Sequence, residues 1–260
     1  ACQASQRSRQ VVLDGLSRLE YRGYDSAGIA LASPGKLNVI KAVGKLVNLR
    51  EAVDQDAPAD AFAGIGHTRW ATHGRPTVAN AHPHVSPDGR FALVHNGIIE
   101  NADNLRAQLR AQGAVFASET DTEVVVHLLA HAYDQADPAS YTGEVAQLSG
   151  TDEAVARRLV VAMREVTAKL EGTFTLLALS TESPNVIVAA RRSSPLVIGL
   201  GEGENFLGSD VLAFIEHTNR AVEIGQDQLV VVSASAVTVI GADGHPVPLK
   251  EYEVDFSADR

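Results

Sequence analysis

The sequence predicts an α+β fold in which antiparallel sheets are covered by helices. Short apolar runs rich in β-branched residues fill both ends of the chain, and helical periodicity is concentrated in the middle. Turn signals such as Ser33-Pro34-Gly35 and Ser86-Pro87-Asp88-Gly89 separate neighbouring runs at short spacing. Blocks of strands and helices, rather than regular alternation, favour antiparallel sheets over a parallel one.

The first block contains one helix and four strands. Apolar residues recur at helical spacing from Val11 to Leu19, which predicts an amphipathic helix that ends near Tyr21 before Gly23 turns the chain. Strands are predicted over residues 27–32, 37–42, 62–67 and 91–95.

Three helices follow. Residues 101–112 predict a surface helix that ends at Gly113. Thr120 and Glu123 fit a capping box at the start of a second helix, and Thr151 is predicted to cap a third that runs to Gly172.

Beyond Gly172 the sequence predicts strands almost exclusively. They are expected over residues 173–179, 186–190, 196–200, 205–208, 229–232 and 236–240. The glycine-rich residues 199–203 follow a strand without a helix and are predicted to form a hairpin loop. Because no repeat or long linker divides the chain, we expect a single domain over residues 1–260.

The composition excludes several classes of protein. The 260 residues are 45% hydrophobic and carry a formal net charge of −10, which disfavours nucleic acid as a partner. The apolar runs are too short to cross a bilayer, and the first ten residues lack the apolar core of a secretory signal, so we expect a cytoplasmic protein. The single cysteine, Cys2, cannot form an intramolecular disulfide or a cysteine-rich metal site.

Two charged residues suggest a site for an amino acid. Arg69 lies in a glycine-bounded segment after an apolar strand, where its guanidinium can bind a carboxylate bidentately beside Thr72 and His73. The alternative is a surface ion pair for Arg69, with Trp70 as a core residue. Asp121 either caps its helix or binds a substrate ammonium.

The segment His95-Asn96-Gly97 can supply donors to an oxyanion. An Asn side-chain amide and a Gly backbone N–H converge easily because glycine has no Cβ. The alternative for Asn-Gly is an ordinary hairpin turn.

Neither a metal nor a nucleotide cofactor is expected. Five histidines, residues 67, 73, 82, 84 and 95, lie close together in the sequence, but none of the usual zinc-ligand spacings connects them. Phosphate-loop, nucleophile-elbow and dinucleotide fingerprints are also missing from the sequence.

Taken together, four segments are similar to a known family. They are residues 21–28 (YRGYDSAG), 66–74 (GHTRWATHG), 95–101 (HNGIIEN) and 119–123 (ETDTE). With residues 80–84 (NAHPH), 190–196 (ARRSSPL) and 208–210 (GSD), they resemble the glutaminase half of glucosamine-6-phosphate synthases, also called glutamine–fructose-6-phosphate aminotransferases. These are class II glutamine amidotransferases of the N-terminal-nucleophile hydrolase superfamily, and Tyr24 favours them over amidophosphoribosyltransferases.

This resemblance implies a four-layer αββα sandwich that hydrolyses glutamine to glutamate and ammonia without a cofactor. It implies that the ammonia passes to a carboxy-terminal isomerase module, absent from this chain, which makes glucosamine 6-phosphate from fructose 6-phosphate. It further implies a homo-oligomer for the full-length protein.

The resemblance also assigns roles to residues. It implies that Cys2 is the nucleophile, with its α-amine as general base. Asn96 and Gly97 are implied to form the oxyanion hole, and Arg22 to brace the catalytic loop. The implied substrate-binding residues are Arg69 for the carboxylate, Trp70, Thr72 and His73 for the pocket wall, and Asp121 for the amine.

The amino end departs from the family. Members begin with the nucleophile in a strand of the form Cys-Gly-Ile-Val-Gly-Tyr, whereas this chain begins Ala1-Cys2-Gln3. The first strand is therefore expected to be missing or altered, and acylation by Ala1 removes the basicity of the Cys2 nitrogen. Two alternatives stay open: a non-catalytic domain that binds glutamine or glutamate, and a structural partner domain with an empty pocket.

Overall fold

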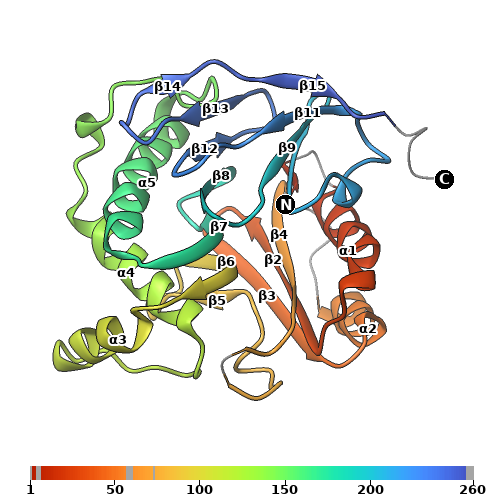
Figure 1. Ribbon diagram of the computed structural model, residues 1–260, viewed down its shortest axis with the longest axis vertical. Helices are drawn as coiled ribbons and strands as arrows, with labels where there is room; N and C mark the ends of the chain where they lie inside the picture. Colours follow the sequence, from red (N-terminus) through yellow and green to blue (C-terminus); the bar gives the residue numbers. More distant parts are fainter. Residues whose placement is uncertain (1, 4–6, 57–60, 73, 256–260) are drawn as a thin grey trace.

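The computed structural model describes residues 2–3, 7–56, 61–72 and 74–255, with the backbone alone described at residues 2–3. Two sheets lie face to face, and helices cover both outer faces (Figure 1). This arrangement confirms the predicted α+β class and the αββα layering.

Sheet A is the layer that contains the amino-terminal strands. It is built from β1 (Cys2–Gln3), β2 (Ser26–Ser33), β3 (Lys36–Val43), β4 (Ala63–Arg69), β9 (Val197–Leu200), β10 (Asn205–Gly208), β11 (Arg220–Glu223) and β15 (Glu251–Glu253). Their spatial order is β15-β11-β9-β10-β1-β4-β2-β3, and neighbouring strands are antiparallel.

Sheet B faces it across the core. Its strands are β5 (His84–Val85), β6 (Phe91–Ile99), β7 (Gly172–Ser180), β8 (Ser183–Arg192), β12 (Leu229–Val232), β13 (Val237–Ile240) and β14 (Pro246–Val247). Their order is β14-β13-β12-β8-β7-β6-β5, again antiparallel throughout.

The helices occupy the two outer layers (Figure 1). Sheet A is covered by α1 (Ser8–Arg18) and α2 (Leu46–Asp56), and sheet B by α4 (Asp121–Gln135) and α5 (Gly150–Lys169), with α3 (Ala102–Ala111) packed beside α4. Short 3-10 helices lie at η1 (Glu20–Arg22), η2 (Pro138–Ser140) and η3 (Val211–Ala213). Within the described residues, no helix has the length and apolar character needed to span a bilayer.

Three apolar cores hold the four layers together. One lies between sheet B and its helices and includes Leu129 and Met163. A second lies between the sheets and includes Ile65 and Leu179, and a third lies between sheet A and its helices around Leu49. Each sheet therefore buries both faces, which explains the nearly continuous apolar runs of the central strands.

The predicted helix starts are confirmed in part. Thr120 caps α4 by accepting from the Glu123 backbone N–H at 3.4 Å. The reciprocal half of the capping box is wrong, because the Glu123 carboxylate accepts from the amides of Ala117 and Ser118 instead. The prediction for Thr151 is also wrong, since the N-cap position of α5 is Ser149.

Several short elements were not predicted. Helix α2 buries only Leu46, Leu49 and Val53, so its apolar stripe is too narrow to stand out in the sequence. Strands β5, β11, β14 and β15 are two to four residues long and carry no clear alternation. The hairpin predicted at residues 199–203 is confirmed, because it connects the antiparallel pair β9 and β10.

The first strand is altered rather than missing. Strand β1 lies between β4 and β10, with Cys2 opposite Gly64 and Phe206. It spans two residues, whereas β4 spans seven. A short central strand therefore stands where the family pattern has a longer one.

Helix α1 approaches sheet A closely at two glycines of β4. A Cβ added to Gly66 would lie 2.5 Å from Val12 Cγ1 and 3.0 Å from Leu16 Cδ1, and one added to Gly64 would also meet Val12. Because Ala63 and Ile65 belong to the core between the sheets, the alternating glycines leave the opposite face flat enough for the helix.

We expect Gly66→Ala to destabilise the protein by overpacking, by about 1–3 kcal/mol, or roughly 2–4 °C in Tm per kcal/mol. Thermal unfolding of Gly66→Ala, Val12→Ala and the double variant measures the coupling. The double variant should be more stable than the sum of the single effects predicts, because Val12→Ala makes room for the new methyl group. Strict additivity would contradict the proposed contact.

Candidate active site

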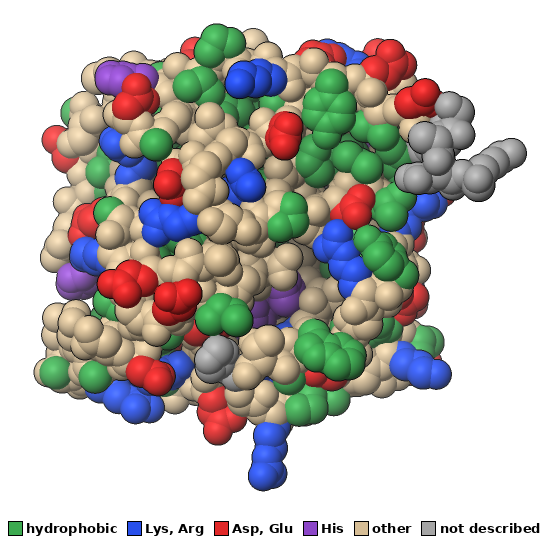
Figure 2. Space-filling model, viewed as in Figure 1, with side chains coloured by type: hydrophobic (Ala, Val, Ile, Leu, Met, Phe, Trp, Pro, Cys, Tyr) green, Lys and Arg blue, Asp and Glu red, His purple; other side chains and the backbone are tan. Residues whose placement is uncertain are grey.

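One cavity of about 460 Å³ lies where β4, β6 and the start of α4 meet. Its polar part is lined by His67, Arg69, His95 and Asp121, and its apolar part by α1 and β10. Figure 2 shows a hollow on this face of the molecule, with histidine side chains visible at its floor.

Most of the predicted site residues converge on this cavity. The residues that line it are Arg22, Arg69, Trp70, Thr72, Asn96, Gly97 and Asp121. They come from η1, β4 and the loop after it, β6 and α4, which are far apart in the sequence. His73 lies outside the described residues, so its predicted place in the pocket wall stays a prediction.

Arg69 is buried at the end of β4, with 5% of its surface exposed. Its Nη1 and Nη2 atoms donate to the backbone carbonyls of Arg75 and Gly74, each at 3.3 Å. The alternative of an exposed surface ion pair is therefore wrong. These carbonyls are neutral, so they orient the guanidinium without cancelling its positive charge.

Asp121 is buried at the start of α4, with 8% of its surface exposed. Its Oδ2 atom accepts from the backbone N–H of Ile99 at 2.9 Å, which ties the helix to the end of β6. Capping of α4 is left to Thr120, so the alternative of Asp121 as a helix cap is wrong. The Ile99 N–H is neutral, so it orients the Asp121 carboxylate without cancelling its negative charge.

Asn96 and Gly97 lie inside β6, opposite Thr175 and Phe174 of β7, so the hairpin-turn alternative is wrong. Gly97 has a φ of 129°, and a Cβ there would lie 2.3 Å from the Thr173 carbonyl oxygen. Only glycine fits that backbone. Asn96 beside it is exposed and lines the cavity.

Arg22 connects two segments at the rim of the cavity. Its guanidinium donates to Ser209 Oγ at 2.8 Å and to Asp210 Oδ2 at 3.1 Å, just after β10. Tyr21 donates to the same carboxylate oxygen at 3.1 Å. These bonds support a bracing role for Arg22.

Trp70 also lies at the rim, where 67% of its surface is exposed. Its ring approaches Gly23, at which an added Cβ would be 3.2 Å from Trp70 Cζ3. The alternative of Trp70 as a core residue is therefore wrong.

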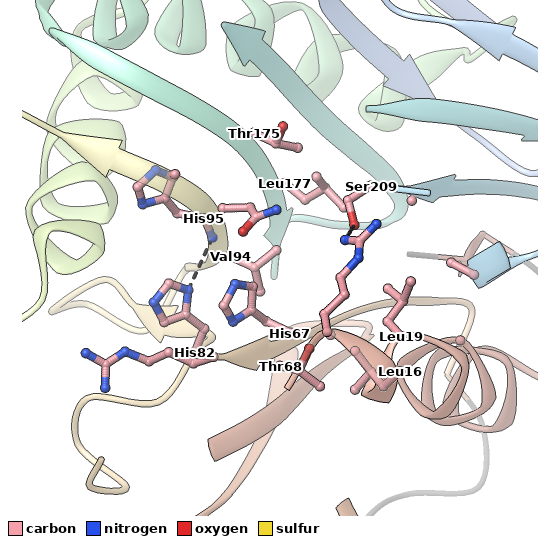
Figure 3. A pocket seen from close by; sticks show the side chains of 18 of the residues that line it. Leu16, Leu19, His67, Thr68, His82, Val94, His95, Thr175, Leu177 and Ser209 are labelled. Atoms are coloured by element: carbon pink, nitrogen blue, oxygen red, sulfur yellow. Dashed lines mark hydrogen bonds between the residues drawn. The ribbon is translucent and has the colours of Figure 1, made fainter. Parts of the chain in front are cut away.

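Four histidines lie together beside the Asn96 strand: His82, His84 and His95 are buried, and His67 is partly exposed. The rings of His67 and His82 stack with centroids 4.1 Å apart, and His84 meets His82 edge-on at 5.1 Å. Figure 3 shows His67, His82 and His95 at the cavity, with the hydrogen bond between His82 and His95 dashed.

The hydrogen bonds fix the proton positions of two of them. The His95 backbone N–H donates to His82 Nδ1 at 3.3 Å, so in a neutral ring His82 Nε2 carries the proton that faces Thr122 Oγ1 at 3.3 Å. His95 Nε2 faces the Thr173 carbonyl at 3.3 Å and must donate, which leaves Nδ1 as an acceptor. Thr122 is 3.0 Å from that atom and supplies the donor.

Burial keeps these histidines neutral. It lowers the pKa of His67 to about 3 and that of His84 to about 3, with positive neighbours adding to the effect. Burial also lowers the pKa of His82 and that of His95, although Asp121 partly offsets the change at His95. Among the described residues, no group of three His, Cys, Asp or Glu side chains is arranged to hold a metal.

The position of Cys2 weighs against its predicted role. Cys2 lies opposite Gly64, five residues before Arg69 in β4. At about 3.3 Å per residue, the Cys2 backbone is roughly 16 Å along the strand from the level of Arg69.

Two residues that support the site were not predicted. Thr122 is fully buried and links His82 to His95, and Asn80 is 2% exposed and links the Arg69 loop to Glu119. Both lie inside the segments that carry the family resemblance, which was the one available signal. Their roles depend on contacts between distant segments.

Residues 27–146 match the family model described as a glutamine amidotransferase domain. This segment of the chain belongs to the glutamine amidotransferase family. The match includes Arg69, Asn96, Gly97 and Asp121, which line the cavity of this amidotransferase domain together with residues on either side of the matched segment.

Curated relatives of the amidotransferase domain are longer proteins. It is 52% identical over 253 residues to glutamine–fructose-6-phosphate aminotransferase (isomerizing) of Streptomyces coelicolor, covering 97% of this chain and 38% of that protein. It is 48% identical over 248 residues to the Corynebacterium glutamicum protein of the same name, covering 95% and 37%. The chain thus spans little more than a third of these relatives.

Solved structures support the fold. Glutamine phosphoribosylpyrophosphate amidotransferase from B. subtilis matches with a TM-score of 0.68 and 24% identity, over 92% of this chain and 47% of that one. An allosteric regulatory enzyme of purine biosynthesis matches with a TM-score of 0.69 and 23% identity, over 98% and 48%.

The amidotransferase domain should lose stability in acid. The buried histidines have folded-state pKa values below the ordinary 6.5, so below that pH the unfolded chain binds more protons. The free energy of unfolding should therefore fall between about pH 6.5 and 3, by roughly 1.4 kcal/mol per pH unit for each such histidine.

Urea unfolding at pH 7, 6 and 5 measures this slope. His67→Gln preserves a donor for the His95 backbone and removes one titrating ring, so the slope should decrease by about 1.4 kcal/mol per pH unit. The same change at exposed His245 should leave it unaltered. Equal slopes in the wild type and His67→Gln would contradict the prediction.

Proposed function

We propose that this domain hydrolyses glutamine to glutamate and ammonia. The observation that carries the proposal is the meeting of a buried guanidinium, a buried carboxylate and an exposed Asn-Gly pair on one cavity. Groups of this kind match the charged ends of an α-amino acid and the carbonyl of a side-chain amide.

The glutamine lies with its α-carboxylate on Arg69 and its α-ammonium on Asp121. Both protein charges are buried, and the Arg75 carbonyl and the Ile99 N–H that orient them are neutral backbone groups, so each charge attracts an opposite ligand charge. The side-chain amide then extends toward Asn96 and Gly97. A volume of about 460 Å³ accommodates a small amino acid with solvent.

The chemistry proceeds by covalent catalysis. A thiolate attacks the side-chain carbonyl, and the Asn96 amide and the Gly97 N–H stabilise the tetrahedral oxyanion. A free α-amine near neutral pKa takes the thiol proton and returns it to departing ammonia. Water then cleaves the thioester and releases glutamate.

The attacking thiol belongs on a continuation of β1 rather than at Cys2. Strand β1 is antiparallel to β4, so residues placed before Ala1 in the same register advance toward the cavity. In that register, the fourth residue before Ala1 would lie opposite Arg69. A strand of the family form Cys-Gly-Ile-Val, joined to Ala1, brings its cysteine to that level.

The wider role follows from the longer relatives named glutamine–fructose-6-phosphate aminotransferase. We propose that residues 1–260 act as one domain that supplies ammonia to an isomerase module, which uses it to convert fructose 6-phosphate to glucosamine 6-phosphate in the cytoplasm.

Binding of L-glutamate, measured by calorimetry, tests the substrate contacts without requiring turnover. Arg69→Lys should weaken binding about tenfold, because the bidentate geometry is lost. Asp121→Asn should weaken it by about thirtyfold or more, because a buried ion pair with the ammonium is lost. Arg220→Lys, at an exposed ion pair with Glu251, is the matched control. Unchanged affinity in both site variants would reject the proposed contacts.

Ammonia release tests the nucleophile. Joining Cys-Gly-Ile-Val to Ala1 should raise glutaminase activity roughly a hundredfold over the same extension beginning with Ala, because the thiol then reaches the oxyanion site. Cys2→Ala should not reduce the activity of the extended protein. If Cys2→Ala abolishes ammonia release from the chain without an extension, Cys2 is the nucleophile and the argument from register is wrong.

A further inference from the structure

Asn80 is a buried amide that connects the loop after β4 to the segment before α4. Its side-chain Oδ1 accepts from the backbone N–H of Glu119 at 2.9 Å. Its Nδ2 donates to the Arg75 carbonyl at 2.9 Å and to Glu119 Oε2 at 3.2 Å. With 2% of its surface exposed, Asn80 makes these bonds out of water.

The orientation of this amide is determined by its partners. The Glu119 backbone N–H can only donate, so the atom that faces it must be Oδ1. The two hydrogens of Nδ2 then match two acceptors, a carbonyl and a carboxylate. An aspartate in the same place could satisfy the first contact and would repel both acceptors.

Each segment that Asn80 joins carries one charge of the cavity. The Arg75 carbonyl that receives Asn80 also accepts from Arg69 Nη1, so one carbonyl is shared between the amide and the guanidinium. On the other side, Glu119 lies two residues before Asp121. A chain of hydrogen bonds therefore leads from Arg69 through Asn80 to the start of α4.

The loop is packed tightly at this point. A Cβ added to Gly74, whose φ is 79°, would lie 2.6 Å from Asn80 Nδ2 and 2.9 Å from Glu119 Oε2. The carbonyl of this glycine accepts from Arg69 Nη2. Asn80, Gly74 and Glu119 thus form one close contact that limits how far the Arg69 loop can move from α4.

We propose that Asn80 is a positioning residue that sets the spacing between Arg69 and Asp121 and thereby the preference for a ligand with both an α-carboxylate and an α-amine. The inference rests on the proposed function, in which these two residues bind the two charged ends of glutamine. A ligand that contacts two protein groups binds more tightly than one that contacts a single group only when the two groups are held at the right separation.

The residues after Asn80 are held independently. His84 Nε2 contacts Thr120 Oγ1 at 2.8 Å, and His82 Nε2 contacts Thr122 Oγ1 at 3.3 Å. Replacement of Asn80 therefore leaves residues 82–84 attached to α4. The structural effect should fall mainly on the loop that contains Arg75 and on Arg69, which is bonded to it.

The test compares two ligands that differ by one amine. Calorimetry gives the affinity of L-glutamine and of glutaramate, which is glutamine without its α-amine. Wild-type protein should prefer glutamine by about thirtyfold, and Asn80→Asp should reduce that ratio at least about tenfold, because the Asp121 contact is lost first. A variant that is merely less stable weakens both ligands together and leaves the ratio intact.

Two further variants make the outcome specific. Glu119→Gln in the Asn80→Asp background restores a donor opposite the new carboxylate and should recover most of the ratio. Asn205→Asp is the matched control, because Asn205 is 4% exposed and its Nδ2 also donates to a carbonyl, that of Ser233, but it does not line the cavity. The ratio of glutamine affinity to glutaramate affinity in Asn205→Asp should equal that of the wild type.

If Asn80→Asp proves unfolded in a thermal melt, Asn80→Ala removes the three bonds without adding a charge and should lower the ratio in the same direction. An unchanged ratio in the folded Asn80 variants, with glutamine still bound by the wild type, overturns the positioning role alone. Failure of the wild type to bind either ligand overturns the proposed function and, with it, this inference.

Discussion

The site depends on two opposite charges that are buried in one cavity without cancelling each other. Arg69 is oriented by backbone carbonyls and Asp121 by a backbone N–H. Such neutral partners compensate part of the cost of burial and leave the net charge available to a ligand. If the two side chains paired directly, a zwitterion would have to break that pair before it could bind.

The two sheets of the sandwich keep the Arg69 and Asp121 charges apart. Arg69 lies at the end of β4 in sheet A, and Asp121 lies against β6 in sheet B, so the distance between the two sheets separates the two charges. His82, His95 and Thr122 are connected beside the cavity by neutral hydrogen bonds whose directions are fixed. Gly97 allows β6 to lie close to Thr173 at the same cavity, because a Cβ at this position would be 2.3 Å from the Thr173 carbonyl oxygen.

The fold was largely predictable because its long elements are strongly periodic. Helices α4 and α5 and strands β2, β7 and β8 carry patterns that few alternatives satisfy. Helix α2 and the two-residue strands escaped prediction because their short apolar patterns are defined by neighbours distant in sequence.

In the site, Arg69, Asn96 and Asp121 followed from the family resemblance. Asn80 and Thr122 did not, because a buried amide or hydroxyl is recognisable only once its partners from other segments are known. The register of β1, which separates Cys2 from Arg69, likewise depends on pairing with distant strands.

The chain contains a single tryptophan, and it is the exposed residue at the rim of the cavity. Indole emission shifts and changes in intensity when its solvent contact changes, and the tryptophan emission of this protein comes from one known place. The molecule carries a built-in optical reporter of events at the mouth of its cavity, and no dye or engineered label is needed to follow them in real time.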